Sequence, residues 1–204
     1  MKYKGIIFDF NGTLFLDSEK HMEAWRDFSK KLRGYPFTDE EMRDHMFGRT
    51  NENIIEYAIG KKPDKVLVEK CTAEKEAIYR QMCADDMENF VLTDGAEEFL
   101  DYLKKHNIPR TIATMSEKIN VDFFIKGFQL ERWFDLSKIV YDNGKIPGKP
   151  APDIYQIAAK NLCLKPEECI VVEDAVSGIA AAKNAGIGKI IGIGPNDQHD
   201  FLKS

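Results

Sequence analysis

Short apolar runs alternate with stretches of helical periodicity along most of the chain. Five runs have the length and composition of buried strands, and they cover residues 4–8, 111–113, 139–141, 170–172 and 189–193. Segments with apolar residues at helical spacing lie between most of them. This alternation predicts an α/β fold in which a parallel sheet carries helices on both faces.

One long interval interrupts the alternation early. From residue 17 to residue 86 the sequence has helical periodicity throughout and offers no strand candidate. Apolar residues recur there at helical spacing, and we interpret these stripes as core packing. They are Met22, Trp25, Phe28 and Leu32 and later Val66, Cys71, Ile78 and Met82. We therefore expect two domains, a core formed by residues 1–16 and 87–204 and a helical domain formed by residues 17–86.

Several helix starts carry local signals. Thr38 with Glu41, and Asp94 with Glu97, have the spacing of a capping box. Pro152 suits the first turn of a helix, because proline lacks the backbone N–H that would have no partner there. These signals predict that helices begin close to residues 38, 94 and 152.

The composition is that of an ordinary globular protein. Hydrophobic residues make up 43% and charged residues 31% of the 204 positions, so we expect neither disorder nor a membrane protein. The apolar stretches are too short to cross a bilayer, and the amino terminus lacks the pattern of a signal peptide. We therefore expect a cytoplasmic protein with no membrane partner, and we favour a monomer.

Charge and cysteine content exclude two further classes of protein. The formal net charge is -5, whereas proteins that bind nucleic acid usually display a basic face, so we expect no nucleic-acid partner. The four cysteines form neither a CxxC pair nor a cluster with zinc spacing, and we expect reduced thiols at Cys71, Cys83, Cys163 and Cys169.

The first candidate for chemistry directly follows an apolar run. Asp9, Asn11, Gly12 and Thr13 come immediately after the strand predicted at residues 4–8. Open α/β sheets bind ligands beyond the carboxyl ends of their strands, so Asp9 would lie at such a place. Gly12 allows a tight turn beneath an anion, and Thr13 offers a hydroxyl that could hold the carboxylate. The same residue types occur in ordinary turns, so this motif alone is weak.

Two further candidates carry a hydroxyl and an ammonium group. Thr114, followed by Met115 and Ser116, ends the second predicted strand just before a helix, where backbone N–H groups can bind an anion. Thr114 could equally be a helix cap. Lys149 lies between a glycine and Pro150, and this rigid setting favours an ammonium group that neutralises a phosphate over a mobile surface lysine.

The fourth candidate is a pair of adjacent carboxylates. Glu173 and Asp174 end the apolar run at residues 170–172 and precede an alanine-rich helix. Two such carboxylates at a strand end are costly unless they are paired or bind a cation. Oxygen ligands of this kind suit Mg²⁺, which takes one or two carboxylates and keeps several waters. The alternative is a pair of acids that cap the helix.

Taken together and in this order, the four stretches resemble the four motifs of the haloacid dehalogenase-like superfamily, and they span nearly the whole chain. The branch most similar contains β-phosphoglucomutase-like enzymes and sugar phosphatases, which carry a small helical cap after the first motif. The resemblance implies a Rossmann-like core and a helical cap at residues 17–86.

The resemblance also implies roles for individual residues. Asp9 would be the nucleophile, and Thr114 and Lys149 would contact the phosphate, with Met115 and Ser116 completing the anion cradle. Mg²⁺ would be held by Asp9, the backbone carbonyl of Asn11, Asp174 and Glu173. In the cap, three residues lie where mutase-like relatives keep side chains that face the active site: His21, Arg49 and Lys75. For Arg49 and Lys75 the alternative is an exposed surface charge.

Asn11 departs from the family pattern, in which a second Asp donates a proton to the leaving oxygen and then helps to activate water. Asn11 has the same shape but cannot do either, so we expect a loss of about 10²- to 10⁴-fold in rate. Three interpretations follow: a slow phosphatase, a protein whose Asn11 is an engineered or deamidated Asp, and a phospho-ligand-binding or regulatory protein with a vestigial site. A mutase is compatible only with the second.

The sequence therefore predicts an Mg²⁺-dependent phosphoric monoester hydrolase that forms an aspartyl-phosphate at Asp9. The expected substrate is a small phosphorylated metabolite, for which a sugar phosphate is the leading candidate. A closing cap would exclude water from the first chemical step, so large substrates would fit poorly.

Overall fold

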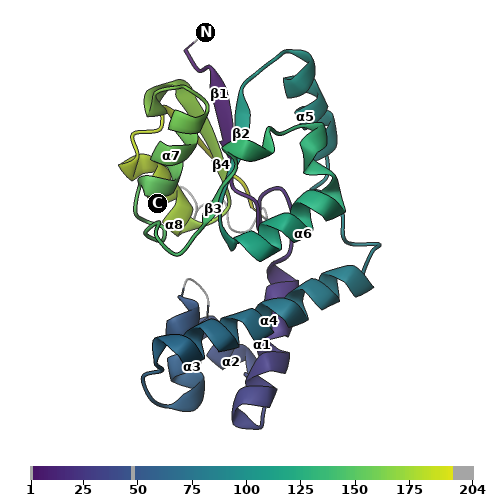
Figure 1. Cartoon of the computed structure of the whole chain (residues 1–204), viewed down its shortest axis with the longest axis vertical. Coiled ribbons are helices and arrows are strands. Elements are labelled where there is room, and N and C mark those ends of the chain that lie inside the picture. Colours follow the sequence, from purple (N-terminus) through teal and green to yellow (C-terminus); the bar gives the residue numbers. More distant parts are fainter. Residues whose placement is uncertain (1, 47–48, 195–204) are drawn as a thin grey trace. The chain divides into compact units, whose positions relative to one another are not determined.

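The computed structural model describes residues 2–46 and 49–194, and its core is a parallel sheet of five strands in the order β3-β2-β1-β4-β5 (Figure 1). All four neighbouring pairs are parallel. The strands are β1 (Gly5–Phe8), β2 (Arg110–Glu117), β3 (Val140–Asp142), β4 (Cys169–Glu173) and β5 (Lys189–Gly192). The five strands predicted from the apolar runs are therefore confirmed, with ends that differ by a few residues.

The strand order reverses beside β1. The chain passes from β1 to β2 and β3 on one side of the sheet, and β4 and β5 lie on the other side. Phe8 pairs with Ile112 of β2 and with Val172 of β4, so the carboxyl ends of three strands meet at one edge. Such a reversal opens a crevice in which α/β proteins bind their ligands.

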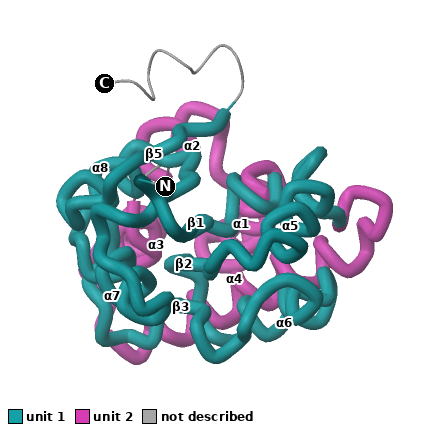
Figure 2. The backbone as a smooth tube through the Cα atoms, turned by 90° about the horizontal axis from the view of Figure 1, so that it is seen from above, with its two compact units in different colours: residues 1–16, 91–204 teal, residues 17–90 magenta. Residues whose placement is uncertain are grey.

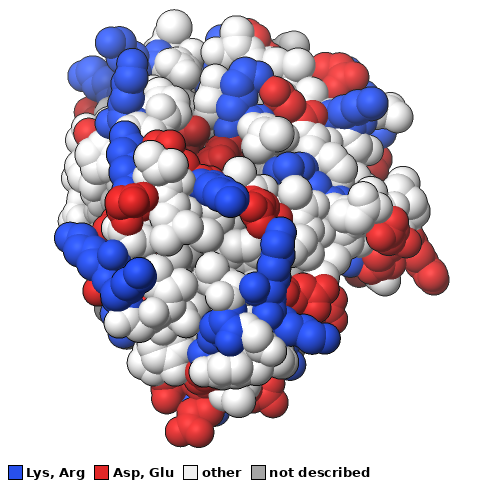
Figure 3. Space-filling view, turned by 60° about the horizontal axis from the view of Figure 1, so that its bottom comes forward, with Lys and Arg blue, Asp and Glu red and all other residues white. Residues whose placement is uncertain are grey.

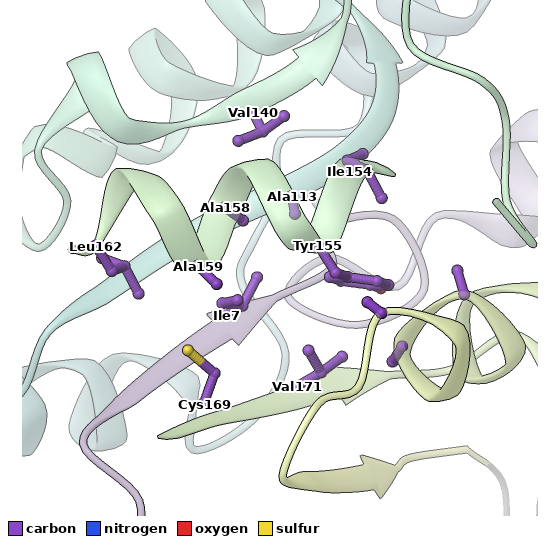
Figure 4. Close-up of a cluster of buried hydrophobic side chains, with 13 residues drawn as sticks. Ile7, Ala113, Val140, Ile154, Tyr155, Ala158, Ala159, Leu162, Cys169 and Val171 are labelled. Atoms are coloured by element: carbon purple, nitrogen blue, oxygen red, sulfur yellow. The ribbon is translucent and has the colours of Figure 1, made fainter. Parts of the chain in front are cut away.

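Helices cover both faces of this sheet, as predicted. On one face, Ile7, Ala113 and Val171 pack with the side chains of α7 (Asp153–Asn161) and α8 (Val176–Asn184) in a buried apolar cluster (Figure 4). On the other face, Phe8 contacts Phe99 of α5 (Ala96–Lys105), with ring centroids 6.2 Å apart. Helix α6 (Lys118–Phe128) follows β2 and contacts both β2 and β3. Short 3-10 turns occupy Leu130–Arg132, Leu136–Lys138 and Pro166–Glu168.

The described chain divides into two compact units (Figure 2). Unit 1 comprises Met1–Leu16 and Val91–Ser204 and contains the sheet; unit 2 comprises Asp17–Phe90. The described part of unit 2 contains helices and no strand: α1 (Ser18–Arg33), α2 (Asp39–His45), α3 (Asn51–Ile59) and α4 (Lys65–Asp85). Its own apolar cluster includes Trp25, Phe28 and Cys71, with Met22, Leu32 and Ile78 packed against it, so most of the helical stripes form a core as we inferred. Val66 is an exception, because its side chain is exposed.

The structure confirms one of three side-chain caps that the sequence suggested at helix starts. Thr38 and Glu41 form the expected capping box at the start of α2. Asp94 does not cap α5, because Gly95 in a left-handed conformation occupies the position before the helix. Thr114 is not a helix cap either: β2 continues to Glu117, and α6 begins only at Lys118.

The distribution of surface charge, the character of the helices and the state of the cysteines can be compared with what the composition led us to expect. On the face shown in Figure 3, lysine and arginine side chains are interspersed with aspartate and glutamate. None of the helices in the described ranges has both the length and the apolar character that a bilayer span needs. All four cysteines are free thiols, and Cys163 is the exposed one among them.

Glu41 connects three parts of unit 2. Its carboxylate accepts two hydrogen bonds from the Arg33 guanidinium, each 2.7 Å long, and others from the Thr38 backbone N–H and the Tyr57 hydroxyl. The hydrogen bonds from Arg33, helped by Thr38 and Tyr57, lower the pKa of Glu41 from 4.5 to about 2. The carboxylate form of Glu41 is therefore favoured by folding.

We predict that Glu41→Gln destabilises unit 2 at neutral pH. Because folding lowers the pKa of Glu41, the stabilisation is fully present above pH 4.5 and is lost as the pH falls toward 2. We expect a loss of roughly 1–2 kcal/mol at pH 7, after discounting for solvent screening, and a smaller difference in acid. Urea unfolding of both proteins between pH 7 and pH 3 measures this. Glu40→Gln, at an exposed neighbouring position, is the matched control; equal losses in the two variants would contradict the prediction.

Candidate active site

Asp9 lies at the crevice between β1 and β4. Its backbone N–H donates to the carbonyl of Val172 at 3.0 Å, which continues the pairing of β1 with β4 one residue beyond Phe8. Asp9 is thereby placed beside Glu173, the last residue of β4. Both side chains are buried, with 6% and 1% of their surface exposed. Two acidic residues separated by most of the sequence thus meet at the carboxyl edge of the sheet.

Lys149 supplies the counter-charge for both carboxylates. Its Nζ lies 2.6 Å from Oδ1 of Asp9 and also forms an ion pair with Oε1 of Glu173. The ammonium group is itself buried and lies 5.1 Å from the ring centroid of Tyr155. The alternative of a mobile, solvated loop lysine is therefore wrong for Lys149.

Both carboxylate oxygens of Glu173 accept hydrogen bonds. Besides the contact with Lys149, its Oε1 accepts a hydrogen bond of 3.1 Å from the Tyr155 hydroxyl, and its Oε2 accepts one of 2.6 Å from the Ala175 backbone N–H. A Cβ at Gly178 in α8 would come within 1.6 Å of Oε1, so only glycine leaves room for this carboxylate. The position of Glu173 is fixed by its surroundings.

Asp174 approaches the turn that follows Asp9. Thr13 donates a hydrogen bond of 3.1 Å from its Oγ1 to Oδ1 of Asp174. Gly12 has a φ of +74°, and a Cβ there would lie 2.1 Å from Oδ2 of Asp174. The turn thus requires glycine for two reasons, because the backbone is left-handed and because the carboxylate lies against it.

Asn11 contacts the residues at the carboxyl end of β2. Its Oδ1 accepts hydrogen bonds from the Ser116 hydroxyl at 2.6 Å and from the Thr114 hydroxyl at 3.3 Å. Thr114 also accepts from the backbone N–H of Ser116 at 3.1 Å. The side chain of Met115 packs against the apolar cluster of unit 1, so its backbone is the part that could contact an anion.

Burial changes the protonation equilibria of this group. Burial raises the pKa of Asp9 to about 7; Lys149 opposes the rise, and Glu173 adds to it. Burial and the charge of Glu173 likewise raise the pKa of Asp174 to about 6. Burial opposes the charge of Lys149, but Asp9, Tyr155 and Glu173 outweigh it and hold the pKa of that ammonium well above its usual value. Asp9 and Asp174 therefore carry unfavourable negative charge that a further cation would relieve.

A divalent cation fits this arrangement. Asp9, Glu173 and Asp174 each place a carboxylate oxygen so that these atoms lie within 4.8 Å of one another. Among the residues that the structure describes, Lys149 is the cationic side chain that pairs with this group, and its single charge does not balance three carboxylates. Oxygen ligands of this density suit a hard ion such as Mg²⁺. The acidic pair does not act as a side-chain cap of α8, because Ala175 precedes that helix.

Three of the predicted site residues belong to unit 2. Lys75 is buried, its Nζ lies 3.1 Å from Nδ1 of His21, and it also pairs with Glu76. Lys75 is therefore not an exposed surface charge. Arg49 is exposed and lies just before Thr50, the capping residue of α3. The contact of these three side chains with a substrate stays a prediction.

Two site residues escaped the sequence analysis. Tyr155 donates to Glu173, and Thr93 donates from Oγ1 to the carbonyl of Thr13 at 2.8 Å. Tyr155 could have been found, because it lies in the first turn of the helix that follows Lys149. Thr93 offers no such signal, since it lies outside every strand and 80 residues from its partner in sequence.

Comparison with known proteins places the chain in a family. A model of the haloacid dehalogenase-like hydrolases matches residues 3–186, so the chain belongs to that family. The predicted recognition and the predicted α/β core are thereby confirmed, and the chain is a hydrolase by family.

Individual relatives agree with this assignment. A phosphorylated carbohydrates phosphatase of Thermotoga maritima is 27% identical over 193 residues, which cover 93% of this chain and 85% of the relative. A β-phosphoglucomutase of Bacillus subtilis is 30% identical over 90% of this chain and 80% of its own length. The crystal structure of a family IA, variant 3 hydrolase from Entamoeba histolytica superposes with a TM-score of 0.87, at 42% identity, over 93% of this chain and 83% of the other.

We predict that Gly178→Ala weakens the binding of divalent cations. The added methyl group would overlap Glu173 and displace its carboxylate, although alanine favours the helix itself. Loss of a correctly oriented carboxylate should lower the affinity for Mg²⁺ roughly 10- to 100-fold. Isothermal titration calorimetry measures this affinity. Ser177→Ala, at the exposed preceding position of α8, should bind Mg²⁺ like the unsubstituted protein; equal affinities for all three proteins would refute the argument.

We also predict that Mg²⁺ binding depends on pH and releases protons. Without the ion, Asp174 with a pKa of about 6 and Asp9 with a pKa of about 7 are protonated in acid, and the ion must displace those protons. Affinity should rise from pH 5 to pH 7, roughly tenfold per unit for each proton displaced, and level off above pH 8. Calorimetry in buffers of different ionisation enthalpy counts the released protons. An affinity that does not change over this interval would contradict the raised pKa values.

Proposed function

We propose that the protein is an Mg²⁺-dependent phosphatase that hydrolyses a small phosphorylated metabolite through an aspartyl-phosphate at Asp9. The observation that carries this proposal is the position of Asp9, whose carboxylate lies at the carboxyl edge of the sheet between Lys149 and two further acidic residues. Family membership supports the reaction class, because the chain is a haloacid dehalogenase-like hydrolase over residues 3–186.

The proposed reaction consists of two successive displacements at phosphorus. An oxygen of Asp9 attacks phosphorus, the ester P–O bond breaks, and the leaving oxygen takes a proton. Water then attacks the aspartyl-phosphate, which releases phosphate and restores Asp9. Lys149 can neutralise charge on the phosphoryl oxygens, and hydroxyl and N–H groups at the end of β2 can bind them, from Thr114, Met115 and Ser116.

Bound Mg²⁺ would supply charge neutralisation and orient the phosphoryl group. The residues that would hold it are Asp9, Asp174, Glu173 and the backbone carbonyl of Asn11. Lys149 already pairs with Asp9 and Glu173, so it fixes the acidic group before an ion binds.

Asn11 sets the rate that this site can reach. Its amide cannot donate a proton as a carboxylic acid does, so the leaving group has to take its proton from elsewhere. Its Oδ1 accepts hydrogen bonds from Ser116 and Thr114, and a carboxylate oxygen would accept the same bonds. The surroundings of residue 11 therefore suit Asp as well as Asn, which supports a weakened phosphatase whose other parts are intact.

A small phosphorylated sugar is the proposed substrate. The relative from Thermotoga maritima is a phosphatase of phosphorylated carbohydrates, and the relative from Bacillus subtilis is a β-phosphoglucomutase. We propose that His21, Arg49 and Lys75 of unit 2 bind the part of the substrate that distinguishes one sugar phosphate from another. The pairing of Lys75 with His21 supports a joint role for these two side chains.

A phospho-ligand-binding or regulatory protein is the second candidate, and Asn11 is the observation that favours it. Such a protein would keep the anion-binding groups and the cation site but would not turn over. A mutase requires Asp at position 11, which deamidation could produce. The Gly12 backbone nitrogen would have to attack the Asn11 side chain, but its N–H donates to the carbonyl of Phe15 at 2.7 Å. This hydrogen bond supports an intact Asn11 in the folded protein.

We predict measurable, Mg²⁺-dependent hydrolysis of p-nitrophenyl phosphate, whose leaving group needs little protonation. Asp9→Asn should abolish it, because the nucleophile is lost. Asn11→Asp should raise kcat for an alkyl phosphate such as a hexose phosphate by about 10²- to 10⁴-fold, and should raise it less for p-nitrophenyl phosphate. Steady-state kinetics on both substrates, with and without EDTA, measure these effects.

The outcomes separate the candidates. Peptide mass spectra that show intact Asn11 in an active preparation exclude activity from a deamidated fraction. Activity that is equal in the unsubstituted protein and in Asp9→Asn would overturn the proposed nucleophile. No turnover by either protein, with no gain in Asn11→Asp, would favour the binding protein.

A further inference from the structure

A cavity of about 340 Å³ opens at the amino-terminal edge of the sheet, within unit 1. It is formed around the start of β2, by the segment that joins α5 to that strand, by the 3-10 turns before β3 and by the end of α7. Its size is at the lower end of the range for small-molecule sites. Thr114 and Ser116 lie toward the opposite end of β2, so this cavity is separate from the candidate active site.

Arg110 is an unusual residue in the wall of this cavity. Its Nη1 donates to the carbonyl of Ile108 at 2.9 Å, but its buried Nε has no hydrogen-bond partner within the described parts of the chain. Burial lowers the pKa of Arg110, and no carboxylate among the described residues opposes that effect. A partly buried cation without a counter-charge is costly, and an anion in the cavity would relieve that cost.

The charges around Arg110 favour an anion. Lys104 and Lys138 also line the cavity, and Asp135 is the acidic residue of the lining. Asp135 lies 3.7 Å from Lys138, so this carboxylate is already paired with another cation and does not neutralise Arg110. Lys104 donates to the backbone carbonyl of Arg132. The remaining wall contains apolar surface from Ile108, Pro109, Trp133 and Leu162.

We propose that this cavity is a second binding site, which takes a small organic oxyanion. The guanidinium of Arg110 would bind its phosphate or carboxylate group, Lys104 and Lys138 would add attraction, and the apolar wall would contact a short carbon skeleton. A guanidinium presents N–H groups in a planar fork that suits either kind of oxyanion. The proposal does not depend on the reaction proposed above, because the two sites lie at opposite edges of the sheet.

Nuclear magnetic resonance tests the proposal at Arg110 itself. The Nε–H signal of Arg110 is assigned as the arginine signal absent from Arg110→Gln, and the protein is titrated with inorganic phosphate and, separately, with succinate. We expect a saturable downfield shift of that signal with a dissociation constant of about 1 mM or lower for at least one probe. The two titrations distinguish a phosphate site from a carboxylate site. No saturable shift below about 10 mM with either probe would overturn the proposal.

The indole signal of Trp133 gives a second readout. The chain has two tryptophans, so Trp25→Phe identifies the signal of Trp133. We expect that signal to shift with the same affinity, and the affinity to fall at least about tenfold in Arg110→Gln. Lys105→Met, an exposed neighbour of Lys104 outside the cavity, should bind as the unsubstituted protein does. Equal loss in Lys105→Met would mean an unspecific charge effect and would overturn the proposal.

Two controls keep the result interpretable. Rates of p-nitrophenyl phosphate hydrolysis should be equal in Arg110→Gln and the unsubstituted protein, because Arg110 does not belong to the candidate active site. If Arg110→Gln does not fold, the double variant Lys104→Met with Lys138→Met replaces it. This variant should weaken the response of the Arg110 signal severalfold, and an unchanged response would contradict the proposed role of the two lysines.

Discussion

The ion pairs of Lys149 are the interaction on which the site depends. Asp9 and Glu173 end adjoining strands, and their burial would cost several kcal/mol each without an opposite charge. Lys149 reaches both carboxylates at once, from the loop that leads into α7. One ammonium group therefore connects the pairing of β1 with β4, the loop before α7 and the first turn of α7. A change in the geometry of any of these three would alter the other two.

The neighbours of the acidic group leave it little freedom. Tyr155 and Ala175 hold Glu173, Thr13 holds Asp174, and the two glycines at positions 12 and 178 make room for these carboxylates. A small, hard cation would need little reorganisation of these oxygen atoms in order to bind. The residual negative charge, which raises the pKa of Asp9 and Asp174, is what such a cation would compensate.

The sequence predicted those parts of the molecule that follow from local pattern. All five strands carried a clear apolar signal, and the acidic and basic residues next to strand ends could be assigned to one edge because parallel strands end together. Contacts that depend on tertiary packing could not be predicted. The hydrogen bond from Thr93 to the turn after Asp9 joins segments with no shared pattern, and the burial of Lys75 beside His21 follows from how α1 and α4 pack.

The position of β1 in the sheet also bears on how the protein is made. β1 pairs with β4, which follows it by more than 160 residues in the sequence. Until β4 has left the ribosome, one edge of this apolar strand lacks that partner in the nascent chain, and such edges are prone to aggregation. The edge that carries Asp9 and Glu173 can form only after β4 has been synthesised, so a product truncated before β4 would combine an incomplete site with an exposed strand that is prone to aggregation.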